Sequence, residues 1–158
     1  MRVFLSYNAR DSEFADEFRR HLANEQIRVW DPAHELLPGS NWLLQTGKAF
    51  ERADAVVFLL SKDSTASPTL RREVEYVISN EKFADRVIPV LLENNLDNVP
   101  WILMKMNVVN AADGDAKRAA SQVAQALRPP VKVKFRPARR LSLKREASKT
   151  PAQKTKRR

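Results

Sequence analysis

The run ADAVVFLLS, residues 53–61, decides the fold that this sequence predicts. After Asp54 its apolar residues follow one another without a polar interruption, which is typical of a strand buried on both faces. A parallel sheet that is covered by helices on both sides provides such burial. The runs RVFLSY at 2–7 and VIPVLL at 87–92 have the same apolar character. We therefore expect a central parallel sheet.

Between and beyond these runs, weaker strands alternate with amphipathic helices. Ser67 followed by Pro68 is a typical helix start, and Ser40 or Asn41 is expected to cap another helix. Five strands that alternate with helices predict a doubly wound α/β fold with helices on both faces of the sheet, and the strand order stays open. The expected strands are 2–7, 27–30, 53–61, 87–92 and 106–111, and the expected helices lie near 14–22, 43–50, 68–78 and 116–127.

The net charge of +9 is distributed unevenly along the chain. Residues 1–128 hold 16 Lys and Arg against 18 Asp and Glu, whereas residues 129–158 hold 12 against one. The second segment has few apolar residues, so burial cannot offset the entropy of ordering it. We predict one domain at 1–128 and a disordered basic tail at 129–158. Residues 131–158 are expected either to attract nucleic acid or an anionic surface without sequence preference, or only to add solubility.

The sequence lacks the residues that several functional classes need. The sequence contains no cysteine, which excludes disulfides and thiolate metal sites and fits a cytoplasmic location. It has no apolar run of the ~20 residues that a transmembrane helix needs, and it has neither a glycine-rich phosphate loop nor a Gly-x-Ser-x-Gly motif. It has two histidines, and neither indicates a particular reaction. We therefore predict no metal site, no bound cofactor and no transmembrane segment.

Ligands of open α/β folds bind where the strands end, so the residues that follow the predicted strands are the first candidates for a site. These residues are Ser6, Asp31, Ser61 and Glu93. The segment after the second strand, DPAHELLPGSNW at 31–42, is a long loop with two prolines and a glycine. Its Leu36 and Leu37 either stay exposed or pack against the surface of their own domain.

Four successive segments resemble the motifs of TIR (Toll/interleukin-1 receptor) domains of the bacterial type. The resemblance covers about residues 1–110, and it implies a flavodoxin-like, five-stranded parallel sheet. It also implies that the loop at 31–42 contacts other TIR domains, including further copies of this chain. The segments are FLSYNARDSEFADEFRRHL (4–22), DPAHELLPGSNW (31–42), ADAVVFLLS (53–61) and SPTLRREVEY (67–76).

The resemblance implies an activity as well, because many TIR domains cleave NAD, as a substrate, at the bond between nicotinamide and ribose. They use a glutamate of the third helix, and Glu73 has that position. Helical spacing places Glu73 at the margin of the apolar face, while Glu75 points further to solvent. A fixed carboxylate can stabilise the oxocarbenium character that develops on the ribose. The spacing alone also fits an ordinary charged residue at the edge of an amphipathic helix.

One position departs from the family pattern. Many active members carry a tryptophan one helical turn before the glutamate, and this chain has Thr69 there. Tyr7 or Trp42 would then supply the aromatic contact, although core packing is favoured for Trp42, which matches a position that is usually structural. The predicted catalytic residue is Glu73. The predicted substrate-binding residues are Ser6, Tyr7, Asp31, Gly39, Trp42, Ser61 and Thr69.

Two functions therefore compete. The first is a NAD glycohydrolase of defence or signalling, with a linear or a cyclic product. The second is a non-catalytic module that recruits other TIR domains through residues 31–42. This second hypothesis stays open because Thr69 stands where many active members carry a tryptophan.

Overall fold

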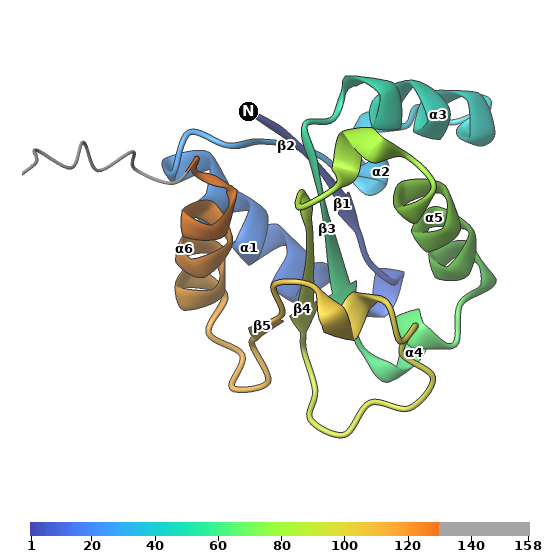
Figure 1. Ribbon diagram of the computed structural model, residues 1–158. Coiled ribbons are helices and arrows are strands. Elements are labelled where there is room, and N and C mark those ends of the chain that lie inside the picture. Colours follow the sequence, from blue (N-terminus) through green and yellow to red (C-terminus); the bar gives the residue numbers. More distant parts are fainter. Residues whose placement is uncertain (130–158) are drawn as a thin grey trace, which may run out of the picture.

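All five strands of the sheet run parallel, in the order β2-β1-β3-β4-β5. The computed structural model describes residues 1–129 (Figure 1). The order is that of flavodoxin-like folds, and it confirms the predicted fold class. The strands are β1 (Arg2–Ser6), β2 (Arg28–Trp30), β3 (Ala55–Leu60), β4 (Val87–Leu91) and β5 (Val109–Asn110).

Helices cover both faces of this sheet. In Figure 1, α1 and α6 lie on one side and α3 and α5 on the other. These four helices are α1 (Ser12–Asn24), α3 (Trp42–Arg52), α5 (Pro68–Ile78) and α6 (Ala116–Leu127). Short helical turns connect the rest: η1 (Ala9–Asp11), α2 (Pro32–Glu35), α4 (Lys62–Thr65), η2 (Glu81–Phe83) and η3 (Leu103–Lys105).

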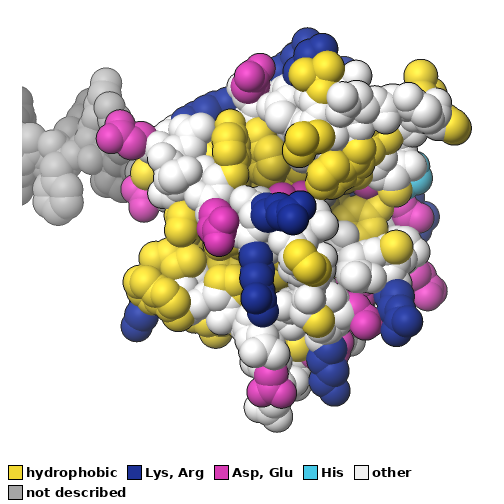
Figure 2. All heavy atoms as spheres, turned by 90° about the vertical axis from the view of Figure 1, so that its right-hand side faces the viewer, with side chains coloured by type: hydrophobic (Ala, Val, Ile, Leu, Met, Phe, Trp, Pro, Cys, Tyr) yellow, Lys and Arg dark blue, Asp and Glu magenta, His cyan; other side chains and the backbone are white. Residues whose placement is uncertain are grey.

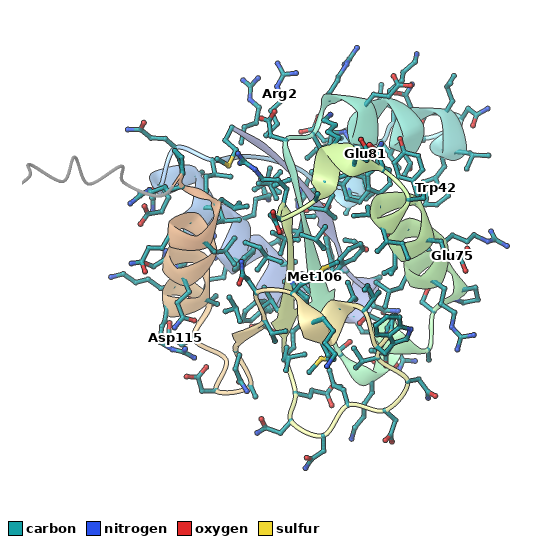
Figure 3. All side chains as sticks on the ribbon, in the orientation of Figure 1. Arg2, Trp42, Glu75, Glu81, Met106 and Asp115 are labelled. Carbon is teal, nitrogen blue, oxygen red and sulfur yellow. The ribbon has the colours of Figure 1, made fainter. Side chains whose placement is uncertain are left out.

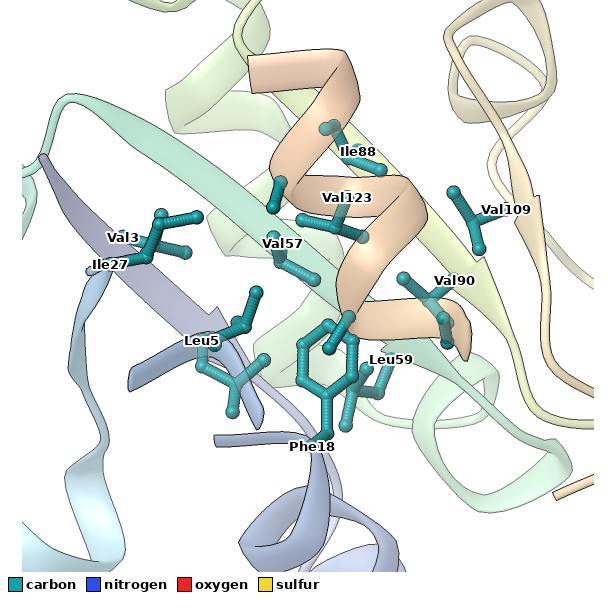
Figure 4. Packing of buried hydrophobic residues seen from close by; sticks show 14 of the residues in the cluster. Val3, Leu5, Phe18, Ile27, Val57, Leu59, Ile88, Val90, Val109 and Val123 are labelled. Atoms are coloured by element: carbon teal, nitrogen blue, oxygen red, sulfur yellow. The ribbon is translucent and has the colours of Figure 1, made fainter. Parts of the chain in front are cut away.

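Two hydrophobic cores result from the alternation of side chains along the strands. Every residue of β3 is buried, as the apolar run 53–61 predicts. The core beneath α1 and α6 includes Val3, Leu5, Phe18, Val57, Leu59 and Val123 (Figure 4). The core beneath α3 and α5 includes Phe4, Phe50, Val56, Phe58, Leu60 and Val74.

The helix that carries Glu73 starts where the sequence predicts. The Ser67 side chain accepts a hydrogen bond from the backbone N–H of Thr69, and Pro68 occupies the first turn. For α3, the structure selects Asn41 rather than Ser40 as the cap, since its side chain accepts a hydrogen bond from the N–H of Leu44. Both helices therefore have fixed first turns, and these turns lie beside the candidate site.

Two exposed apolar side chains lie at the end of α5 and in the loop at 31–42. Ile78 continues the apolar spacing of Leu70, Val74 and Val77 along α5, yet it is 50% exposed, because it lies in the last turn of the helix, where it extends past the core. The loop at 31–42 contains the short helix α2. Within this loop Leu37 is 77% exposed, so it does not pack against its own domain, whereas Leu36 is half-buried.

The predicted basic tail, apart from Pro129, lies outside the described residues. Within residues 1–129, none of the helices has both the length and the apolar character needed to cross a bilayer.

Candidate functional site

A carboxylate is buried at the end of the sheet where the strands terminate. Glu73 of α5 is only 7% exposed. The hydroxyl of Ser6, the last residue of β1, donates a hydrogen bond to Glu73 Oε2. These two residues are 67 positions apart in the sequence, and the fold brings them together. Glu75 is exposed, as the helical spacing predicts.

Burial controls the charge of Glu73. It raises the pKa of the Glu73 carboxyl from 4.5 to about 7, because the ionised form loses water that the protein does not replace. The hydrogen bond from Ser6 acts in the opposite direction and favours the ionised form. Glu73 is therefore divided between its two protonation states near neutral pH. Groups with this property are concentrated at functional sites.

Two adjacent cavities meet at Glu73. The first has a volume of about 210 Å³ and opens between the end of β1 and the start of α5. The second has a volume of about 180 Å³ and lies between α3 and α5. Trp42, Thr69 and Glu73 line both. The first cavity is also lined by Ser6, Tyr7, Asn8, Ala9, Pro32, Ser64, Ser67 and Leu70.

Trp42 is part of this site and not of the core. It is 43% exposed, and it is the first residue of α3. Figure 3 shows it beside α5, on the side of the molecule where the helix also carries the outward-pointing Glu75. The expectation of core packing for Trp42 is therefore wrong, because the first turn of α3 extends beyond the edge of the hydrophobic core. Trp42 and Thr69 both border the two cavities.

Asp31 supports the cleft without lining either cavity. Its buried carboxylate accepts hydrogen bonds from the Tyr7 hydroxyl at 2.9 and 3.0 Å, and from the N–H of Ala33 at 2.9 Å. Burial raises the pKa of Tyr7, and the hydrogen bond to Asp31 raises it further, so the phenol keeps its proton. Asp31 thus fixes Tyr7, which lines the first cavity.

Asp31 also belongs to an ion-pair network with Asp16 and His34. Their ligand atoms lie within 4.8 Å of one another, a spacing that a metal ion would accept. The Arg19 guanidinium, however, lies 3.7 Å from Asp16 and 4.0 Å from Asp31. Because this cation offsets part of the negative charge of the two carboxylates, the cluster is better described as a link between α1 and α2.

The structure does not bring Ser61 and Gly39 to the cavities. The Ser61 hydroxyl is buried and donates to Asp11 Oδ2 at 2.6 Å, and its oxygen caps α4. This contact explains why Asp11, the residue before α1, makes no side-chain cap to that helix. Gly39 has a φ of +79° in the exposed part of the loop at 31–42, a conformation that favours glycine. Neither residue lines the two cavities beside Glu73.

Sequence reasoning missed part of the cavity lining. Ser67 is recognisable as a helix cap, but nothing in the spacing predicts that it also borders the first cavity. Asn8 follows the first strand, where ligands bind in such folds, and that position is a signal that could have identified it. Ser64 gives no comparable signal, because its place depends on the capping turn of α4.

The fold and the cleft define a flavodoxin-like α/β domain with a buried carboxylate at the strand ends. The sequence profile of the TIR domain family matches residues 3–128. This chain therefore belongs to the TIR domain family.

Solved structures agree with this fold. The TIR domain of the Toll-related receptor TRR-2 from Hydra magnipapillata is 18% identical, with a TM-score of 0.61 over 76% of this chain and 91% of that chain. The SEFIR domain of interleukin-17 receptor B is 20% identical, with a TM-score of 0.55 over 80% of this chain and 96% of that chain. None of the curated proteins matches the chain.

Proposed function

We propose that this TIR domain is a NAD glycohydrolase that acts in cytoplasmic signalling or defence. The observation that carries the proposal is the position of Glu73, a buried carboxylate with a pKa of about 7 that lines both cavities of the cleft. A charged residue at the edge of an amphipathic helix would normally point to solvent, as Glu75 does. Burial of Glu73 costs stability, and a role in chemistry explains why the cost is tolerated.

The proposed reaction breaks the C–N bond between ribose and nicotinamide. The bonding electrons go to the cationic nicotinamide, which leaves as a neutral molecule, so no general acid is needed. Positive charge develops on the ribose, and the Glu73 carboxylate stabilises it at close range in a desolvated site. Ser6 holds the carboxylate through its hydrogen bond. Water then adds to the ribose and releases a proton, which gives ADP-ribose, whereas attack by the substrate's own adenine would give a cyclic product.

Cavity size indicates how much of NAD the cleft can hold. Pockets that enclose a drug-sized ligand usually measure about 300–1,000 Å³, and each cavity here is smaller, at about 210 and 180 Å³. We infer that the nicotinamide and its ribose occupy the cleft. The rest of the substrate would lie across the surface beside the loop at 31–42.

Trp42 is the proposed aromatic contact for nicotinamide, in place of the tryptophan that is absent at position 69. The nicotinamide ring of NAD is cationic, and an indole attracts such a ring by about 0.5–2 kcal/mol. Trp42→Ala is therefore expected to raise the KM for NAD about tenfold, and Trp42→Phe is expected to restore part of the loss. Steady-state measurement of nicotinamide release tests this expectation.

Trp101→Ala provides the control, because Trp101 is exposed and lines neither cavity. Equal kinetic constants for Trp42→Ala and the wild type would exclude Trp42 from substrate binding.

A second function, assembly with other TIR domains, is favoured by exposed leucines. Leu37 of the loop and Leu43 of α3 are 77% and 75% exposed, and large exposed apolar side chains can mark an interaction surface. Figure 2 shows hydrophobic side chains over the face of the molecule that α3 and α5 form. We propose that further copies of this chain bind there.

The double variant Leu37→Ser/Leu43→Ser is expected to weaken self-association by about tenfold or more, because each leucine would lose its burial in the interface. Sedimentation over a range of protein concentrations measures the effect. Met104→Ser, at another exposed apolar position, is the control. A wild-type chain that stays monomeric throughout the range would contradict the proposal.

A further inference from the structure

A separate basic groove lies at the end of the sheet where the strands begin, away from Glu73. Its volume is about 420 Å³, and the starts of β1 and β2 form it together with α2 and α3. Glu35 is the single carboxylate among its lining residues. Figure 3 shows Arg2 at this end of the molecule. The four cations that line the groove are Arg2, Arg28, Lys48 and Arg52.

The arrangement of these cations is unfavourable in the isolated domain. Arg2 and Arg28 are direct partners in the register of β1 with β2, so two like charges adjoin across neighbouring strands. Lys48 and Arg52 are four residues apart on α3, where like charges again repel each other. Within the described part of the chain, none of the four forms an ion pair.

Asp54, the residue before β3, does not relieve this repulsion. Asp54 accepts a hydrogen bond from the backbone N–H of Arg2 at 2.7 Å, and the structure gives it no contact with the Arg2 guanidinium. Residues 1–128 as a whole carry more acidic than basic residues. Four unpaired cations around one groove therefore indicate an anion that binds from outside.

The groove also has an aromatic side. Trp30 lines it and is partly exposed, and its ring stacks on Phe4 with centroids 5.0 Å apart, which fixes its orientation. Cations along a groove together with an aromatic ring are the usual means of binding a single nucleic-acid strand. A flat cationic face with protruding apolar side chains would instead suit a membrane.

The basic tail starts from the same end of the sheet. The Arg86 guanidinium, just before β4, donates to the carbonyl oxygen of Leu127 at 3.5 Å. Arg128 pairs with Glu25, just before β2, at 2.6 Å. Residue 129 therefore begins beside the strand starts, where the groove also lies.

We propose that the basic groove binds the phosphate backbone of a single-stranded nucleic acid. The groove supplies four cations, Arg2, Arg28, Lys48 and Arg52. Binding is expected to depend on salt, because each neutralised phosphate releases counterions.

The test compares two full-length variants of equal charge. The groove variant is Arg28→Gln/Lys48→Gln/Arg52→Gln. The control variant removes three exposed lysines elsewhere, at positions 62, 105 and 117. Fluorescence anisotropy with a labelled oligonucleotide measures the affinity of each at several salt concentrations.

The groove variant is expected to bind at least about tenfold more weakly than the control variant, with a salt slope lower by about 2 for three lost phosphate contacts. The charge-preserving variant Arg28→Lys/Lys48→Arg/Arg52→Lys should retain binding. The melting temperature of the groove variant should equal or exceed that of the wild type, because the substitutions relieve repulsion between cations. Equal weakening in the groove and control variants would overturn the proposal, because the groove cations would then contribute no more than lysines elsewhere on the surface.

Two further measurements distinguish a nucleic-acid strand from other ligands that carry phosphate. ADP should compete with the oligonucleotide only weakly, and tight ADP binding that depends on the groove would identify a nucleotide site instead. Vesicles with anionic lipids should bind the groove and control variants equally. A loss of vesicle binding in the groove variant alone would overturn the assignment to a nucleic-acid strand.

Discussion

Glu73→Gln is expected to lower the release of nicotinamide from NAD by about a hundredfold or more, the usual effect of removing a preorganised electrostatic group. Glutamine keeps the size of the side chain and can still accept the hydrogen bond from Ser6. It lacks the negative charge that would stabilise the oxocarbenium-like transition state. The measurement is the rate of nicotinamide release by concentrated protein, because the activity is expected to depend on self-assembly.

The wild-type rate should also depend on pH in a defined direction. The pKa of Glu73 is about 7, and the ionised form is the one that stabilises positive charge. The rate should therefore fall as the pH decreases below 7 and reach a plateau above it.

Glu75→Gln is the matched control, since Glu75 lies two residues away on the same helix and is exposed. Its rate should stay close to that of the wild type. An active Glu73→Gln would remove this residue from the mechanism. If the wild type does not cleave NAD even when it is artificially clustered, the interaction module becomes the function, and Thr69 becomes the natural explanation for the missing activity.

The same substitution is expected to stabilise the fold. The pKa of Glu73 rises from 4.5 to about 7 on folding, so the folded state holds a proton that the unfolded chain releases. The stability that this group contributes is fully present below pH 4.5, falls between pH 4.5 and 7, and stays low above pH 7. Across this pH range, the contribution of Glu73 to the free energy of unfolding falls by about 3 kcal/mol.

Glu73→Gln should therefore exceed the wild type in free energy of unfolding by up to about 3 kcal/mol at pH 8 and by little near pH 4.5. Urea denaturation of both proteins at the two pH values measures this difference, and the comparison cancels the titration of all other groups. Glu75→Gln should show no such dependence on pH. A Glu73→Gln variant that is less stable than the wild type at pH 8 would show that the carboxylate has a structural role.

Much of the fold was predictable because it depends on local patterns. The uninterrupted apolar run at 53–61 indicates a strand buried on both faces, and β3 is buried throughout. Ser67 and Pro68 indicate where α5 begins. Helical geometry also distinguishes Glu73 from Glu75. At 100° per residue, Glu73 falls at the margin of the apolar face of the helix, and Glu75 points further to solvent.

The rest depends on contacts between distant segments. Nothing local shows that Ser6 bonds to Glu73, or that Ser61 bonds to Asp11 instead of lining the cleft. The sequence predicts a core position for Trp42 because tryptophan is usually well buried. Only the position of α3 relative to α5 places it at the cleft. The strand order likewise follows from packing rather than from any single run.

The two outer strands of the sheet restrict how copies of this chain can join. β2 has three residues and β5 has two, so each edge offers very few free backbone groups. Strand addition, in which a partner extends a sheet through main-chain hydrogen bonds, needs a longer edge than this. Filaments of the cross-β kind are therefore disfavoured, and any ordered polymer of this domain would be held by side chains, reversible by dilution and adjustable by single substitutions on its surface.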